Sequence, residues 1–187
     1  METIRVGKWT IEVDSEATRK VQLARLSGKP ETCDCQDCRN FIRARDFAYP
    51  DAARSFLASL GIPFDRESEI GLAMGELDSK IFGYSGFFHF IGSIIETPPE
   101  WQSKEPGHVV HHEKIAGDFA IAFLAPHGLV PKEFPSDVPL VHLDFITLVP
   151  WVLDERYSGG LPLNPWAEFG LFARLKRWCK AIRSLYW

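Results

Sequence analysis

The segment Phe87–Ile95 is apolar on both of the faces that a β-strand would present. Such a segment is typical of a strand at the centre of a sheet, where both faces are covered. Other strand-like segments, rich in β-branched and aromatic residues, are Ile4–Val13, Ile70–Gly75, Val109–Ile115, Phe119–Leu124 and Leu140–Val149. We therefore predict an antiparallel sheet of about five or six strands.

Helical patterns lie on both sides of these segments in the sequence. Asp14 or Ser15 is suited to cap a short helix that stops before Gly28, and Pro50 is suited to begin another that ends at Gly61. A last helix, amphipathic and basic, is predicted over residues 164–187. The expected fold is α+β, with N-terminal helices and a long C-terminal helix packed on the sheet.

The length and charge of the chain limit the classes of protein to which it can belong. The chain has 187 residues, the size of one domain, so we expect residues 1–187 to form a single α+β domain. Its 25 acidic and 21 basic residues give a formal net charge of −4, whereas nucleic-acid-binding proteins usually carry a basic face. Nucleic acid is therefore not the expected partner.

The basic residues of the last predicted helix leave one alternative open. They include Arg174, Arg177, Lys180 and Arg183. Beside the aromatic residues of the same helix, they suit binding of an anion or a nucleic acid. We favour the simpler interpretation of a core-packed helix whose solvated face is basic.

No segment of the sequence has the apolar length of a transmembrane helix. The longest fully apolar run is Phe119–Ala125, seven residues, against about 20 needed to cross a bilayer. The first residues also lack the pattern of a signal peptide. A cytoplasmic protein is therefore expected, and its cysteines are expected to stay reduced.

Three cysteines, Cys33, Cys35 and Cys38, stand within six residues. Neither helical nor strand spacing would bury all three in a core, whereas zinc binds such thiolates tetrahedrally. We therefore predict a zinc site, with a fourth ligand from Cys179, from a histidine such as His89 or His111, or from solvent. Reduced structural thiols and a Cys35–Cys38 redox pair are the alternatives.

The sequence favours a structural role for the histidines over a role in acid–base chemistry. His89 lies in the most apolar strand, where a hydrogen-bonded core residue is expected and a general base is the alternative. His142 and Asp144 share one strand face, an arrangement that can orient an imidazole. An enzyme that combines a histidine with the cysteines or a metal thus stays open as the second hypothesis, without an assigned reaction.

Two motifs of the chain resemble those of a known family. The first is Cys33-x-Cys35-x-x-Cys38-Arg39-Asn40-Phe41, and the second is Tyr84-x-Gly86-Phe87-x-His89-Phe90-x-Gly92. The chain is similar, over roughly residues 5 to 155, to a family of small uncharacterised bacterial proteins with a Cys-x-Cys-x-x-Cys-x-Asn-Phe segment and an aromatic-His-Phe-x-Gly strand. The resemblance implies no activity and transfers no catalytic residue.

These observations lead to one functional expectation. We expect a non-enzymatic cytoplasmic protein in which the cysteine segment acts as a structural zinc or reduced-thiol site. Its role would be to bind a partner protein or a small ligand, neither of which the sequence identifies.

Overall fold

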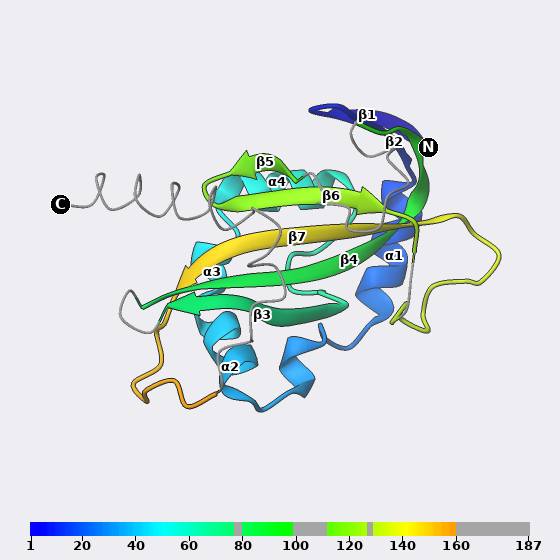
Figure 1. Cartoon of the computed structure of the whole chain (residues 1–187). Coiled ribbons are helices and arrows are strands. Elements are labelled where there is room, and N and C mark those ends of the chain that lie inside the picture. Colours follow the sequence, from blue (N-terminus) through cyan, green and yellow to red (C-terminus); the bar gives the residue numbers. More distant parts are fainter. Residues whose placement is uncertain (77–79, 99–111, 127–128, 160–187) are drawn as a thin grey trace, which may run out of the picture.

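A long strand, β4 (Ile81–Glu96), runs through the middle of the sheet (Figure 1). In the computed structural model, which describes residues 1–76, 80–98, 112–126 and 129–159, every strand pair is antiparallel. The order is β1-β2-β4-β7-β6-β5, with β3 also paired to β4. The other strands are β1 (Glu2–Val6), β2 (Trp9–Val13), β3 (Glu69–Glu76), β5 (Glu113–Ala116), β6 (Phe119–Leu124) and β7 (Leu140–Pro150). The prediction of an antiparallel sheet is confirmed.

Among the described residues the sheet has seven strands, because the prediction of a single strand over Ile4–Val13 is wrong. That segment folds back on itself as the hairpin β1–β2, in which Val6 pairs with Trp9. Gly7 in the turn has a φ of +56°, a conformation that favours glycine. The alternation of apolar residues runs through the turn without a break, so only Gly7 marked the reversal.

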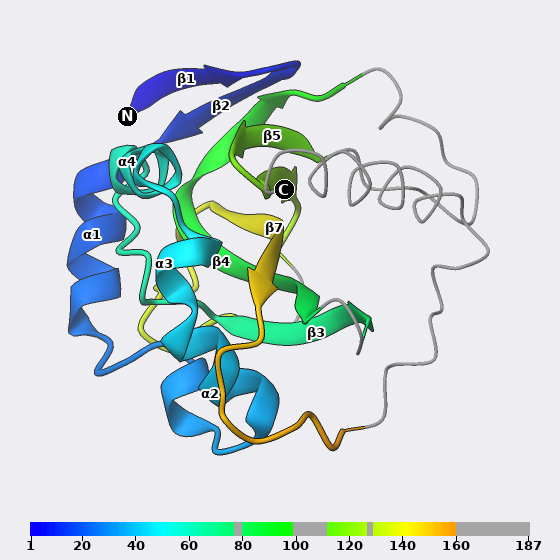
Figure 2. The same cartoon turned by 90° about the vertical axis from the view of Figure 1, so that its left-hand side faces the viewer.

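Helices cover one face of this sheet, as Figure 2 shows. They are α1 (Ser15–Ala24), the 3₁₀ turn η1 (Pro30–Thr32), α2 (Gln36–Arg43), α3 (Arg45–Ala48) and α4 (Asp51–Ser59). Asp14 caps α1 by accepting a hydrogen bond from the Ala17 N–H at 2.9 Å, as predicted. Gly61, with a φ of +77°, lies just past α4, and the Ile62 N–H donates back to the Leu57 carbonyl. The predicted N-terminal helices are thus confirmed.

The core lies between these helices and the sheet and is largely aromatic. Tyr49 of the α3–α4 junction packs edge-on against Phe119 and Phe145, and Phe41 of α2 contacts Tyr84 at a centroid distance of 5.3 Å. All five side chains are fully buried. Edge-on and tilted packing of these aromatic rings holds α2 and the α3–α4 junction in fixed positions against the sheet.

Some sequence predictions concern residues that the structure does not describe. The predicted helix 164–187, with Arg174, Arg177, Lys180 and Arg183, lies outside the described residues, as do Cys179 and His111. The expectation of one domain over residues 1–187 therefore stays a prediction. In the described ranges, no helix combines the length and the apolarity that a bilayer crossing requires.

Candidate functional site

The three predicted cysteine ligands converge in space. The sulfur atoms of Cys33, Cys35 and Cys38 all lie within 4.8 Å of one another, and those of Cys33 and Cys35 are 3.3 Å apart. The cysteines are free thiols, so no disulfide accounts for their proximity. The central expectation from the sequence, that the thiols meet instead of dispersing into the core, is therefore confirmed at the level of geometry.

The local backbone explains this convergence. Pro30 begins the turn η1, and the Cys33 N–H closes it by donating to the Pro30 carbonyl at 3.1 Å. Cys35 then occupies the N-cap of α2, where its sulfur accepts a hydrogen bond from the Cys38 N–H at 3.5 Å. Two successive turns, one ending and one beginning at a cysteine, direct the sulfurs toward a common point.

The spacing of the sulfurs fits a single tetrahedral ion. With zinc–sulfur bonds of about 2.3 Å, the sulfurs of a tetrahedral site lie about 3.8 Å apart. The sulfur separations, from 3.3 Å to at most 4.8 Å, bracket that value. An iron–sulfur cluster would attach the cysteines to different irons and spread their sulfurs further. The donor set therefore favours one soft ion over a cluster.

The three thiols differ in exposure, and the pKa values of Cys33 and Cys38 shift in opposite directions. Cys35 is exposed and Cys33 half-buried, whereas Cys38 is buried. Hydrogen bonds from the Cys35 backbone and from the neighbouring thiols lower the pKa of Cys33, whereas burial raises the pKa of Cys38. A bound metal ion would therefore have to displace the proton that burial holds on Cys38.

In the described part of the chain, no fourth residue joins the three cysteines. His89 lies elsewhere, on the sheet, so the expectation that it supplies a ligand is not supported. His111 and Cys179, the other proposed ligands, lie outside the described residues. The described site thus offers three sulfur ligands, and the fourth corner of the tetrahedron is left to solvent or to a residue beyond the described ranges.

Asn40 fixes the helix that carries the cysteines. Its side chain is fully buried, and its amide nitrogen donates to the Tyr84 hydroxyl at 3.3 Å and to the Pro150 carbonyl at 3.2 Å. Its amide oxygen accepts a hydrogen bond from the Val152 N–H at 2.8 Å. These bonds join α2 to β4 and to the end of β7, so the asparagine of the first motif is a structural residue rather than a ligand.

A buried carboxylate network fixes the segment before the cysteines. Glu67 is fully buried and accepts hydrogen bonds from Arg45, at 2.9 and 3.2 Å, and from the Tyr49 hydroxyl at 3.0 Å. Arg45 also pairs with Glu31 of η1 at 2.6 Å. Because η1 leads directly into Cys33, this network positions the first cysteine as Asn40 positions the last.

Glu67 makes the stability of the fold depend on pH. Burial raises the pKa of Glu67 from 4.5 to about 7, although Arg45 and Tyr49 act in the opposite direction. The folded chain therefore holds this proton more tightly than the unfolded chain, and the free energy of unfolding falls as the pH rises from about 4.5 to about 7. We expect a loss on the order of 3 kcal/mol across this range. Urea unfolding at several pH values checks this, and Glu67→Gln should abolish that part of the dependence.

The described histidines, His89, His112 and His142, lie together on the face of the sheet opposite the helices α1 to α4. His89 is fully buried, and its Nδ1 lies 3.0 Å from the Ser68 hydroxyl oxygen, which confirms the predicted hydrogen-bonded core histidine. His112 Nε2 lies 2.7 Å from an Asp144 oxygen, and His142 Nε2 lies 3.9 Å from the other. Burial alone would raise the pKa of Asp144, but these histidines lower it. In the described ranges, none of these histidines joins the cysteine group.

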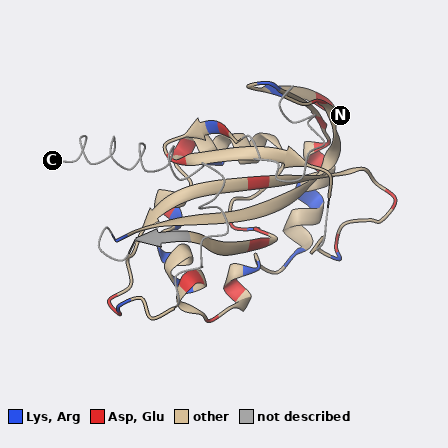
Figure 3. Cartoon of the chain, viewed as in Figure 1, with Lys and Arg blue, Asp and Glu red and all other residues tan. Residues whose placement is uncertain are grey.

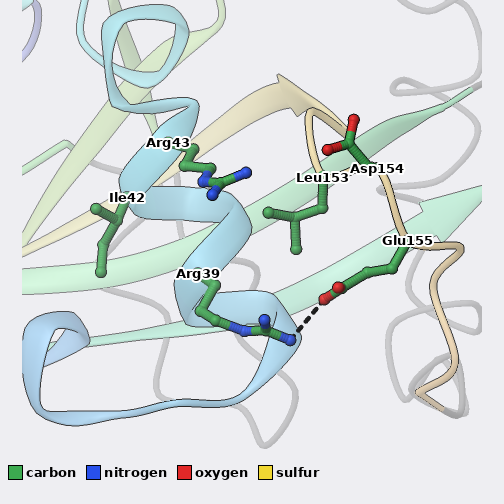
Figure 4. Close-up of a pocket in the computed structure, with 6 residues that line it drawn as sticks. All are labelled: Arg39, Ile42, Arg43, Leu153, Asp154 and Glu155. Carbon is green, nitrogen blue, oxygen red and sulfur yellow. Dashed lines mark hydrogen bonds and ion pairs between the residues drawn. The ribbon is translucent and has the colours of Figure 1, made fainter.

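Sequence reasoning missed a pocket on the outer side of α2. Figure 4 shows Arg39 and Arg43 on this helix and Leu153, Asp154 and Glu155 on the segment that follows β7. The arginines stand four residues apart, a spacing that places both on one helix face and was the available signal. The partner segment is more than 100 residues away in the sequence, so nothing local indicated that the two would meet.

Comparison with protein-family models, with curated protein sequences and with solved structures gives no match for this chain.

Proposed function

We propose that this chain binds one zinc ion through Cys33, Cys35 and Cys38, and that the ion fixes the start of α2 in a non-enzymatic binding protein. The observation that carries this proposal is the convergence of three sulfurs from one short segment. The proposed location is the cytoplasm, where reducing conditions keep the thiols available for a metal. Membership of the bacterial family that the two motifs resemble belongs to the same proposal.

The surroundings of the cysteines support a structural ion. Glu31 on one side and Asn40 on the other are both bonded to the rest of the fold, so the segment that carries the ligands is anchored at both ends, and the ion would fix the segment between them. Three thiolates also give a bound Zn²⁺ an overall charge of −1, which weakens it as a Lewis acid. Since no histidine or carboxylate of the described residues joins the group, a general base for metal-assisted catalysis is not found there.

A zinc titration of reduced, metal-free protein tests the proposal. We expect one equivalent to bind and to raise the free energy of unfolding, because the folded chain presents a formed site and the unfolded chain does not. At free zinc about 100 times the dissociation constant, the gain should be about 2.7 kcal/mol. Magnesium at the same concentration is the control. Binding of less than a tenth of an equivalent, or no change in stability, would contradict the proposal.

Charge distribution gives no support to the anion-binding alternative in the described part of the chain. Figure 3 shows Lys and Arg interspersed with Asp and Glu over the helices and strand ends on the face in view. The basic residues behind that alternative lie in the predicted helix 164–187, outside the described residues. Binding to nucleic acid through that helix stays a prediction.

A further inference from the structure

A second candidate site lies along α2 from the cysteines, in the pocket between this helix and residues 153–155 (Figure 4). Its volume is about 310 Å³, at the lower end of the range in which proteins bind small molecules. The residues that line it are Arg39, Ile42, Arg43, Leu153, Asp154 and Glu155. One wall is thus helical and basic, and the other is an extended segment with two acids.

The four charged residues of the pocket differ in whether they have a hydrogen-bond or ion-pair partner. Arg39 forms an ion pair with Glu155, and this pair ties the two walls together. Within the described residues, neither the Arg43 guanidinium nor the Asp154 carboxylate has a hydrogen-bond or ion-pair partner. The pocket therefore offers one cation and one anion, each on its own wall and each available to a ligand.

Two aliphatic residues, Ile42 and Leu153, also line the pocket. Leu153 is only 9% exposed and, as Figure 4 shows, directs its side chain toward α2. Ile42 is half-buried on the helix wall. A ligand that reaches both Arg43 and Asp154 would thus also lie against the Leu153 side chain.

We propose that this pocket binds the zwitterion of a free α-amino acid with an aliphatic side chain. The carboxylate of the ligand would pair with Arg43, whose planar guanidinium suits two-point binding of a carboxylate. Its ammonium group would pair with Asp154, and its side chain would lie on Leu153. The small volume favours a single amino acid over a peptide. This inference rests on the proposed binding role and names its ligand class, but it requires no metal.

Binding of L-leucine to the full-length protein, followed by the amide NMR signals of α2 and residues 152–155, tests the inference. We expect saturable shifts at these residues. Leucinamide lacks the carboxylate and 4-methylpentanoate lacks the ammonium group, so each should bind about tenfold more weakly or worse. No saturable shift with leucine, or equal binding of all three compounds, would overturn the inference.

Two variants, each of which removes one charge, test whether Arg43 and Asp154 bind the charged groups of the ligand. Arg43→Gln and Asp154→Asn should each weaken leucine binding about tenfold or more. Arg43→Gln should leave the weaker binding of leucinamide unchanged, because that ligand has no carboxylate to lose. Arg19→Gln and Asp137→Asn remove the same charges from exposed positions elsewhere and should have no effect. Unchanged leucine affinity in Arg43→Gln or Asp154→Asn would overturn the assignment.

The same samples separate this inference from the proposed function. Zinc content is measured beside leucine affinity, with and without a chelator. Leucine binding by a chain that takes up no zinc would contradict the proposed zinc site and would support the proposed ligand of the pocket. Stoichiometric zinc without leucine binding would do the reverse.

Discussion

Replacement of Arg45 with alanine should destabilise the folded chain by about 3–5 kcal/mol. Arg45 is the cation that faces the buried carboxylate of Glu67, whose side chain is 0% exposed. Without the guanidinium, that carboxylate keeps, among the described residues, one side-chain donor, the Tyr49 hydroxyl. The cost should be larger at pH 8 than at pH 5, because loss of Arg45 raises the pKa of Glu67 further and protonation removes the buried charge. Urea unfolding at both pH values measures this.

Two further variants keep this prediction testable even if Arg45→Ala fails to fold. The double variant Arg45→Ala with Glu67→Gln should recover much of the loss, because no uncompensated charge remains buried. Arg5→Ala removes an exposed arginine paired with Glu96 and should cost at most about 1 kcal/mol. A cost for Arg45→Ala no larger than that for Arg5→Ala would contradict the role of the network.

Replacement of Cys38 with serine should abolish zinc binding at stoichiometric concentrations. Cys38 is the buried member of the cluster and carries its sulfur on the first turn of α2. A serine hydroxyl is a poor zinc ligand beside thiolates, so we expect zinc affinity to fall by more than about 100-fold. Competition with a chromophoric chelator measures the change.

Asp34→Asn is the matched control for Cys38→Ser. Asp34 lies in the same segment, between two of the cysteines, but is exposed and not part of the sulfur group. This variant should bind zinc with nearly the affinity of the unmodified chain. Equal zinc affinity in Cys38→Ser and in the unmodified chain would show that the ion, if bound, lies elsewhere.

The parts of the fold that follow local rules could be predicted from the sequence. Pro50 and Gly61 delimit α4 because both act through their own backbone geometry, and the apolar residues of β4 identify a central strand wherever the partners lie. The hairpin at Gly7 could not be predicted with the same rules. The alternation of side chains continues across the turn, so a single long strand and two paired strands share one pattern.

The cysteine site was predictable for the same reason, because its three ligands are close in sequence. The contacts that hold these ligands in place could not be predicted from the sequence. Asn40 is bonded to groups between 44 and 112 positions away, and Arg45 meets Glu67 across 22 positions. Contacts of this range depend on the tertiary fold and leave no periodic signal in the chain. The pocket formed by Arg43 and Asp154 was missed for the same reason.

X-ray absorption at the zinc edge, on full-length protein supplied with one equivalent of zinc under reducing conditions, shows whether the cysteine sulfurs bind the ion. We expect a tetrahedral ion with at least three sulfur ligands at about 2.3 Å. An ion bound only through oxygen and nitrogen would contradict it, because the converging sulfurs of Cys33, Cys35 and Cys38 would then have no part in metal binding.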